Sequence, residues 1–279
     1  MHFGRIDQTI LYPLSKAIER EEPNLVIISG DFTQRARVEE FKEAKSFVDN
    51  IKYPMLVIPG NHDISPFFSP IARFLNPYKR YKKYISEKLE PVYIDNEIAV
   101  AGLNTVRSRA IKDGRVSKKQ IANVKKWFGG LSKDVVKIVV THHPLDTHES
   151  YGDHKLARKS FSAIRALSEV GVDAYLSGHF HFTSAVETVR RHKVGNYSAI
   201  AIQAGTVSLR TRHGETGSFN ILTINKNTFS IEPKFWNSEK KDFEAGSEKK
   251  FIFDNSEKRF FFKDSEWKEI GNKSPKQDV

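Results

Sequence analysis

Pro59-Gly60-Asn61-His62-Asp63 directly follows an apolar run, residues 55–58, that is typical of a buried strand. A strand that ends in proline, glycine and three polar side chains indicates a loop presenting an amide, an imidazole and a carboxylate to a bound group. This interpretation makes Asn61 a metal ligand, His62 a catalytic histidine and Asp63 the acid that orients it. The alternative is an ordinary polar turn in which Asn61 or Asp63 caps a helix.

The composition limits the classes of protein and of site. The chain has 279 residues and 39% hydrophobic content, enough for one large domain or one domain with appendages. It holds no apolar run of about 18 residues, so we expect no spanning helix. We also expect no signal peptide and a cytoplasmic location. Because cysteine is absent, a metal must be bound by His, Asp, Asn or Glu, which suits Mn, Fe, Zn or Mg.

The chain carries a formal net charge of +11, which favours anionic partners such as phosphates, nucleic acid or acidic membrane surfaces. Much of the excess lies in lysine-rich surface segments such as residues 79–83. A solvated basic surface is therefore the alternative interpretation, and the charge alone does not identify a partner.

Apolar β-branched runs alternate with segments of helical spacing, a pattern that indicates an α/β fold. The predicted strands span residues 25–29, 55–58, 98–103, 135–140 and 174–177. The predicted helices span residues 9–20, 37–50, 118–128 and 158–169. Residues 66–90 form a predicted insertion over the active face, with a short helix at 78–89.

The second part of the chain is rich in strands. Residues 184–236 alternate apolar and polar positions between turn residues, which predicts antiparallel strands. We therefore place one domain at residues 1–236 and a charged, aromatic-containing appendage at 237–279. The aromatic runs 251–253 and 260–262 predict a terminal hairpin or a partner-binding segment. We expect their side chains to form a packing or homodimer surface.

Residues able to bind metal follow most of the predicted apolar strands. Asp31 follows the first strand and Asn61 the second, while His142 and His179 each follow a later one. In layered α/β folds, binding sites form at the carboxyl ends of the strands. Since several of the ten histidines lie in such positions, we expect these residues to share one site.

A cysteine-free set of Asp, Asn and His is the ligand mix of a two-metal hydrolytic centre. A bridging carboxylate can hold two cations about 3.5–4 Å apart. The cations lower the pKa of a shared water, so that hydroxide exists near neutral pH, and they clamp two phosphate oxygens. A remaining histidine can then protonate the leaving oxygen.

The motifs resemble those of the calcineurin-like metallophosphoesterases in order and kind. They are Gly30-Asp31, Gly60-Asn61-His62-Asp63, Thr141-His142-His143-Pro144 and Gly178-His179-Phe180-His181. The resemblance covers about residues 1–230. Gly30-Asp31-Phe32-Thr33-Gln34-Arg35 and Ala204-Gly205-Thr206 are most similar to the bacterial branch that includes 3′,5′-cyclic nucleotide phosphodiesterases.

This resemblance implies a metal-dependent phosphoesterase with two divalent metal ions, Mn or Fe first and Zn or Mg as alternatives. The first metal would be held by His2, Asp31 and His181. The second would be held by Asp31, Asn61, His142 and His179, with Asp31 bridging. His62 would be the general acid, oriented by Asp63. We prefer His142 to His143 as the ligand of its pair.

The resemblance also implies a four-layer α-β-β-α sandwich, with one departure from the family pattern. The family's first motif is Asp-any-His, and Met1-His2-Phe3-Gly4-Arg5 resembles only its second half. The expected aspartate and the strand that carries it would precede Met1. We therefore expect the fold to be N-terminally truncated, or else a protein that lacks this ligand and strand and binds its first metal weakly.

The predicted substrate is a small phosphodiester, with cyclic nucleotides first. Arg35, Asn104 and His143 are candidate substrate contacts, and His148, His154 and His213 are further candidates beside solvated or turn roles. The alternatives are a nuclease or phosphomonoesterase with the same centre, or a metal-depleted binding protein of the same fold.

Overall fold

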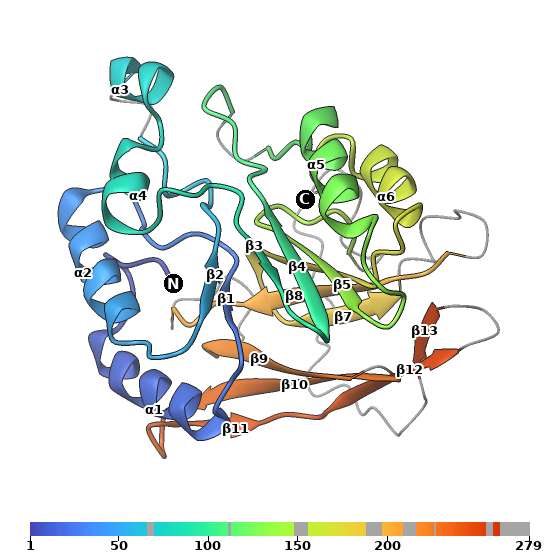
Figure 1. The fold of residues 1–279 in the computed structure, drawn as a ribbon. Helices are drawn as coiled ribbons and strands as arrows, with labels where there is room; N and C mark the ends of the chain where they lie inside the picture. Colours follow the sequence, from blue (N-terminus) through green and yellow to red (C-terminus); the bar gives the residue numbers. More distant parts are fainter. Residues whose placement is uncertain are drawn as a thin grey trace, which may run out of the picture.

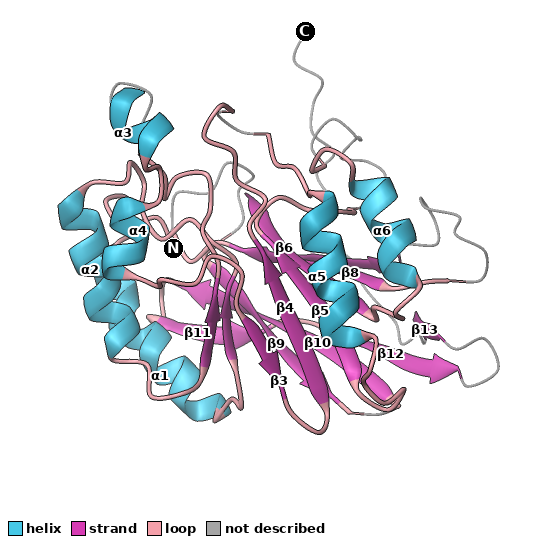
Figure 2. Ribbon diagram, turned by 45° about the horizontal axis from the view of Figure 1, so that its top comes forward, coloured by secondary structure: helices cyan, strands magenta, loops and turns pink. Residues whose placement is uncertain are grey.

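The structure is a computed structural model, and it describes residues 1–65, 70–110, 113–147, 156–187, 197–208, 216–225, 227–254 and 259–262. Its helices lie on the two outer sides of the molecule with the sheets between them, as Figures 1 and 2 show. The fold is thus the α-β-β-α sandwich that the sequence predicted.

A six-stranded sheet forms one inner layer, in the order β3-β4-β5-β6-β8-β7. Its strands are β3 (Val92–Ile94), β4 (Ile98–Leu103), β5 (Val136–Thr141), β6 (Ala174–His181), β7 (Ser184–Glu187) and β8 (Ile200–Gly205). Strands β4, β5, β6 and β8 run parallel, so their carboxyl ends meet at one edge. The antiparallel strands predicted from residue 184 onward include β8, which runs antiparallel to β7 as predicted but also pairs parallel with β6 on its other side.

Two smaller sheets form the other inner layer. The parallel pair consists of β1 (Val26–Ile28) and β2 (Met55–Val57). The five-stranded sheet consists of β9 (Ser218–Ile224), β10 (Thr228–Asn237), β11 (Asp242–Ala245), β12 (Lys249–Asp254) and β13 (Arg259–Phe262). The predicted hairpin of the two aromatic runs is the antiparallel β12–β13 pair.

The helices cover the outer faces. They are α1 (Leu11–Glu21), α2 (Val38–Asp49), α3 (Pro70–Leu75), α4 (Lys79–Tyr84), α5 (Lys118–Phe128) and α6 (Ser160–Ser168), with a 3-10 turn at Gln8–Ile10. Ser117 caps α5 as expected, since its hydroxyl accepts the Gln120 N–H and the Gln120 side chain accepts the Ser117 N–H. The short helix predicted at 78–89 ends early, at Tyr84.

Three apolar clusters separate the four layers. Leu14, Phe41 and Phe47 belong to the cluster beneath α1 and α2. Ile58 and Phe229 belong to the cluster between the inner layers. The third cluster packs α5 and α6 on the six-stranded sheet, with members such as Val124, Val139 and Ile164. The six-stranded sheet therefore buries both of its faces, which explains the nearly continuous apolar runs of its central strands.

The domain boundary at residue 236 stays a prediction, but β11 and β12 pair directly with β10. Phe251 of β12 lies in the cluster between the sheets. Within the described residues, no helix is long and apolar enough to cross a bilayer.

Candidate metal centre

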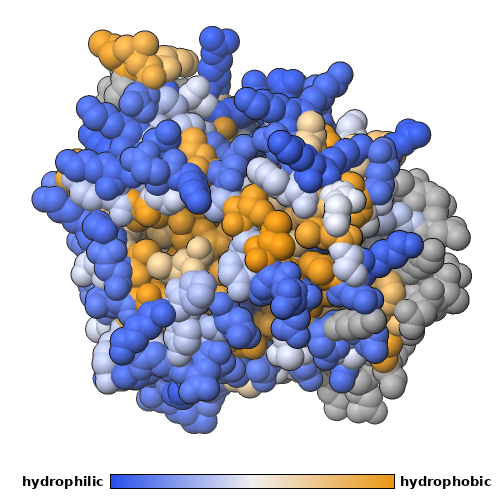
Figure 3. All heavy atoms as spheres, viewed as in Figure 1, coloured by the Kyte–Doolittle hydropathy of each residue, from blue (hydrophilic) through white to orange (hydrophobic). Residues whose placement is uncertain are grey.

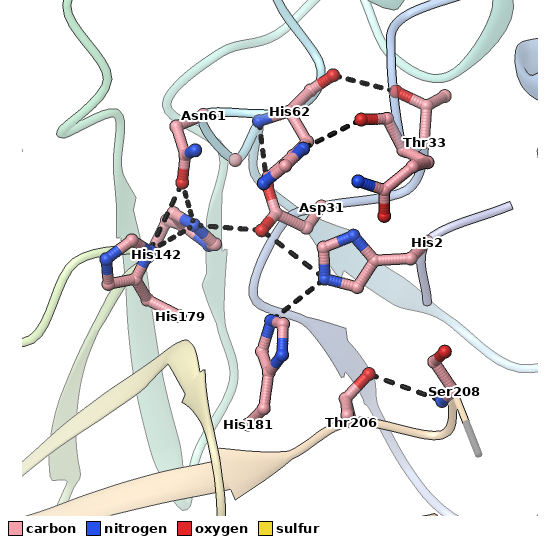
Figure 4. A network of polar contacts seen from close by, with 12 residues as sticks. His2, Asp31, Thr33, Asn61, His62, His142, His179, His181, Thr206 and Ser208 are labelled. Atoms are coloured by element: carbon pink, nitrogen blue, oxygen red, sulfur yellow. Dashed lines mark hydrogen bonds and ion pairs between the residues drawn. The ribbon is translucent and has the colours of Figure 1, made fainter. Parts of the chain in front are cut away.

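The predicted metal ligands converge at the carboxyl ends of β1, β2, β5 and β6 (Figure 4). Asp31 follows β1 after Gly30, and Asn61 follows β2 after Gly60. A Cβ atom on Gly60 would collide with the backbone nitrogen and the carboxylate of Asp31. Glycine is therefore required at position 60, because the two loops that carry the ligands pass in direct contact.

His142 and its neighbours form the first ligand cluster, the His142 group (Asn61, His142 and His179). His142 Nε2 lies 3.0 Å from Asn61 Oδ1 and 3.3 Å from His179 Nδ1. The other His142 nitrogen, Nδ1, lies 2.8 Å from the Ser29 carbonyl oxygen. A carbonyl oxygen only accepts, so Nδ1 carries a proton and Nε2 is the ring nitrogen that faces the centre.

His2 and His181 form the second ligand cluster, the His2 group. Their Nε2 atoms lie 2.9 Å apart, and the Nε2 of His2 lies 3.6 Å from Asp31 Oδ2. His2 is held by the loop that follows β1, because the backbone N–H of His2 donates to the Asp31 carbonyl oxygen over 2.8 Å. His181 lies at the end of β6, where it pairs with Gly205.

Asp31 lies between the two groups, as expected of a bridging carboxylate. Its Oδ2 is 3.3 Å from His142 Nε2 and 3.6 Å from His2 Nε2. Its Oδ1 accepts the backbone N–H of His62 over 2.9 Å. One buried carboxylate therefore faces nitrogen donors of both clusters.

Several of these residues have left-handed backbones, which non-glycine residues rarely adopt. The φ angles are 59° for His2, 56° for Asp31, 73° for His179 and 64° for His181. Such conformations persist only where the surrounding structure holds them, and they concentrate at functional sites. The strained positions here coincide with the predicted ligands.

The electrostatics of the cluster keep several imidazoles neutral. Burial lowers the pKa of His2 to about 2, of His179 to about 3 and of His181 to about 4. For Asp31, burial acts to raise the pKa, but the charge and hydrogen bond of His142 hold it well below its usual range. Divalent metals require neutral imidazoles and an ionised carboxylate, which His2, His179, His181 and Asp31 provide, whereas Asp31 raises the pKa of His142, so a bound metal would displace a proton there.

Two sets of donors meet closely enough to hold an ion within the described chain. One is His2, Asp31 and His62, and the other is His142, His143 and His179, with ligand atoms within 4.8 Å of one another in each set. The predicted ligands thus share one site, and the geometry adds His62 and His143 as close neighbours. Imidazole and carboxylate donors without thiolate fit Mn, Fe or Zn.

His62 is oriented by a backbone carbonyl, which corrects the expectation that Asp63 orients the ring. His62 Nδ1 lies 2.7 Å from the Gln34 carbonyl oxygen, so Nδ1 carries the proton and Nε2 is the exchangeable position. Asp63 instead accepts the N–H groups of Gly60, Phe32 and Thr33 over 2.9, 3.1 and 2.9 Å. It ties the Asp31 loop to the His62 loop.

Burial disfavours the charged form of the Asp63 carboxylate. Its own burial and the nearby Asp31 charge raise its pKa to about 6, although the three backbone N–H groups oppose the shift. Thr33 supports the same loop, since its hydroxyl donates to the His62 carbonyl oxygen over 2.9 Å. Sequence reasoning missed Gln34 and Thr33, and only their position just after Asp31 could have indicated them.

The candidate substrate contacts are distributed more widely. His143 is buried beside His142, and its Nδ1 lies 2.8 Å from the Thr105 hydroxyl, a partner that sequence reasoning missed. Arg35 is exposed, with its backbone N–H donated to Glu40. Asn104 accepts the Val106 N–H and lines a separate hollow of about 500 Å³. His148, His154 and His213 lie outside the described residues.

The sequence matches the calcineurin-like phosphoesterase family over residues 2–182, so the chain belongs to that family. This confirms the resemblance drawn from the motifs. Among curated proteins, the chain is 25% identical over 167 residues to the 3′,5′-cyclic adenosine monophosphate phosphodiesterase CpdA of Haemophilus influenzae, covering 58% of this chain and 56% of that protein.

A second relative is the glycerophosphodiester phosphodiesterase GpdQ of Enterobacter lignolyticus, 41% identical over 58 residues, which is 21% of each chain. The chain thus spans about half or less of the length of these two relatives.

Solved structures share the fold at low sequence identity. Purple acid phosphatase PPD1 from yellow lupin has a TM-score of 0.59 at 12% identity, covering 89% of this chain and 49% of that one. A dimetal phosphatase from Danio rerio has a TM-score of 0.58 at 14% identity, covering 85% of this chain and 87% of that one. These similarities support the fold alone.

Proposed function

We propose that this chain is a metal-dependent phosphodiesterase that uses two divalent ions. The observation that carries the proposal is the position of Asp31, whose Oδ2 faces imidazole nitrogens of both ligand groups at 3.3 and 3.6 Å. A carboxylate shared between two sets of nitrogen donors is the arrangement that a two-metal site needs.

His2, Asp31 and His181 would hold one ion, and Asp31 with the His142 group the other. We propose Mn or Fe first, with Zn and Mg as alternatives. When bound, such ions supply Lewis acidity and lower the pKa of water near the phosphorus. The chain itself supplies imidazole and amide donors and the buried, ionised carboxylate of Asp31.

His62 is proposed to move the proton. Its Nδ1–H stays with the Gln34 carbonyl oxygen, which leaves Nε2 to hold a proton and deliver it to the leaving oxygen. The backbone N–H of His62 is bonded to Asp31 Oδ1, so the same loop fixes the proton donor and the bridging ligand. Asp63 acts indirectly, by holding these loops together.

For the substrate we propose a small phosphodiester, with 3′,5′-cyclic nucleotides first because one relative is named as a cyclic AMP phosphodiesterase. Glycerophosphodiesters are the second candidate, since another relative is named for them. The net charge of +11 suits either anion. Nucleic-acid binding, homodimer formation and a cytoplasmic location remain predictions from the sequence.

The test is a substrate panel with purified protein and added Mn²⁺. We expect hydrolysis of bis(p-nitrophenyl) phosphate and of cyclic AMP, and slower hydrolysis of p-nitrophenyl phosphate and single-stranded DNA. His62→Ala should lower kcat by roughly 10²–10⁴-fold while its metal content stays that of the wild type. Tyr12→Ala, at an exposed position on α1, is the control and should retain full activity.

Two outcomes would reject parts of the proposal. Absence of hydrolysis of every substrate, with His62→Ala indistinguishable from wild type, would favour a binding protein with this fold. Faster hydrolysis of the monoester or of DNA than of either small diester would favour the monoesterase or nuclease alternative.

A further inference from the structure

The short helix α3 presents an apolar face to solvent. Ile71, Phe74 and Leu75 are 76%, 54% and 81% exposed. Side chains three and four residues apart lie on the same face of a helix, so these three form one group, the α3 tip. Within the described chain six large hydrophobic side chains are exposed, and this six-residue helix carries three of them. Such a concentration marks a contact surface rather than scattered exposure.

The opposite side of α3 is held by a buried arginine. Arg73 is only 3% exposed. Its guanidinium donates to the carbonyl oxygens of Ser65, Ser108 and Ala110 over 2.6, 2.7 and 2.7 Å. Position 73 lies two residues from the first and last members of the α3 tip, which places it on the other side of the helix. The charged side chain therefore points inward and the apolar side chains outward, the reverse of an ordinary surface helix.

The α3 tip is convex and firmly anchored. Figures 1 and 2 draw α3 at the edge of the molecule, next to α4. Figure 3 shows hydrophobic residues projecting from the edge of the molecule where Figure 1 draws α3. Arg73 ties the helix to Ser65, two residues after Asp63, and to the loop that follows β4. A fixed apolar projection of this kind is suited to entering a soft apolar phase.

The segments around the α3 tip are basic. Residues 64–86 contain five Lys or Arg and no Asp or Glu. Among them, Lys79, Lys82 and Lys83 are exposed on α4. Arg109 is also exposed, and it lies between residues 108 and 110, whose carbonyl oxygens bind Arg73. Cations therefore accompany the apolar tip, a combination that favours a surface with anionic groups over an apolar interior.

A lipid surface fits these features better than a protein does. In a symmetric dimer built on this face the same basic segments would meet each other, and their like charges would oppose association. A different protein would need an apolar pocket bordered by acids to receive the tip. An anionic bilayer offers both properties at once, and it adapts to a convex contact.

We propose that the α3 tip docks this protein on an anionic lipid bilayer. Ile71, Phe74 and Leu75 enter the boundary between the headgroups and the acyl chains, while the exposed cations of α4 and the loop after β4 attract the anionic headgroups. Docking is peripheral and reversible, because three side chains fall far short of a spanning segment. It does not depend on which phosphodiester the metal centre hydrolyses.

The first experiment is co-sedimentation of the purified protein with lipid vesicles. We expect binding to vesicles of equal parts phosphatidylglycerol and phosphatidylcholine, and much weaker binding to phosphatidylcholine alone. Ile71→Ser/Leu75→Ser should weaken binding by roughly tenfold or more, because two apolar side chains no longer leave water. Tyr12→Ser, at a position 71% exposed on α1, is the control and should bind normally. Unchanged circular dichroism and thermal midpoints establish that both variants are folded.

The second experiment tests the role of the cations. Lys82→Glu/Lys83→Glu should weaken binding to the anionic vesicles at low salt, and the difference from wild type should shrink at high salt. Lys126→Glu/Lys133→Glu is the matched control, because it changes the net charge equally at exposed positions at and beyond the carboxyl end of α5. The control should bind more tightly than Lys82→Glu/Lys83→Glu.

The third experiment separates insertion from adsorption. Since the chain has no cysteine, Leu75→Cys offers a single site for an environment-sensitive dye. We expect the emission of this dye to shift to the blue when anionic vesicles are added, and lipids brominated on their acyl chains to quench it. The same dye on Tyr12→Cys should keep its emission in the presence of either lipid.

Three results would overturn the proposal. The first is absence of binding to anionic vesicles. The second is normal binding of Ile71→Ser/Leu75→Ser without a change in the emission of the Leu75→Cys dye, which would reduce the contact to adsorption of a basic surface. The third is a protein dimer that Ile71→Ser/Leu75→Ser dissociates, which would assign the α3 tip to a second copy of this chain.

Discussion

The His142 group and the His2 group share Asp31, but they are anchored differently. His142 follows β5, which pairs with β4 on one side and β6 on the other. His2 lies outside the described strands, and backbone hydrogen bonds join it to Asp31 and join Phe3 to Phe32 and Gln34, around the isolated Phe3–Thr33 bridge. His142 is therefore fixed by the interior of a sheet, whereas His2 is fixed by backbone hydrogen bonds to the loop after β1, although its neighbour His181 lies on β6.

The two histidine rings also differ in the hydrogen bonds that orient them. His142 Nδ1 is bonded to the Ser29 carbonyl oxygen, which fixes the tautomer of the ring. His2 Nδ1 is buried without a hydrogen-bond partner in the described part of the chain. Partners of this kind typically change metal affinity by about 10–100-fold. The His142 and His2 imidazoles therefore offer similar donor atoms, but the orientation of His142 is fixed more firmly before a metal binds.

Removing the shared carboxylate should have the largest effect, because it acts on both groups. We expect Asp31→Asn to lose both metal ions and to lower kcat/KM by roughly 10³-fold or more. Metal content by mass spectrometry and diester hydrolysis measure this. Asp49→Asn, exposed near the end of α2, is the control. Retention of a full metal complement by Asp31→Asn would contradict a bridging role.

Removing one imidazole from each group tests the comparison itself. We expect the wild-type protein to release the ion at the His2 group first during titration with a chelator. His2→Ala should then keep one tightly bound ion, while His142→Ala should bind its remaining ion roughly 10–100-fold more weakly. Isothermal titration with Mn²⁺ gives both affinities. If the two variants retained ions equally well, the proposed difference in preorganisation would be wrong.

A smaller effect is expected from Gly60→Ala, which replaces none of the ligand residues. The new methyl group would collide with Asp31 and displace the carboxylate from between the two groups. We expect a fall in metal affinity of roughly tenfold and a loss of stability of about 1–3 kcal/mol. Gly130→Ala is the matched control, because a Cβ there meets no atom within 4 Å. Unchanged metal binding in Gly60→Ala would show that the loops can separate without consequence.

The sequence predicted the ligand set better than the contacts that hold it. The runs 98–103 and 118–128 agree residue for residue with β4 and α5, because periodicity and a capping serine marked them. The strand predicted at 174–177 extends to His181, since β6 continues through a register shift that carries the left-handed His179 and His181. An irregular strand of this kind has no period to detect.

The orientation of His62 could not be predicted either. Its partner is the Gln34 backbone carbonyl, and every residue carries such a group, so no residue type marks it. Asp63 was singled out because it is an acid beside a histidine, yet its carboxylate bonds the backbone of Gly60, Phe32 and Thr33. Adjacency along the chain identified the right residues and assigned one of them the wrong partner.

The smallest predicted effect is a pH dependence of opposite sign for His2 and His142 in protein stripped of metal. Burial lowers the pKa of His2 from 6.5 to about 2. Between pH 7.5 and 5 the unfolded chain gains a proton there and the folded chain does not, so His2 destabilises the fold as pH falls, by roughly 2 kcal/mol at pH 5. Replacing it by Gln should remove that loss.

His142 should behave in the reverse way. Burial opposes its charge, but Asp31 outweighs burial and raises its pKa. Its contribution to stability is therefore complete below the unfolded pKa of about 6.5 and is lost as pH rises through the raised value. Relative to wild type, His2→Gln should gain stability from pH 7.5 to pH 5 and His142→Gln should lose it. Urea unfolding in a chelator measures both differences, and slopes of the same sign would mean that Asp31 does not distinguish the two imidazoles.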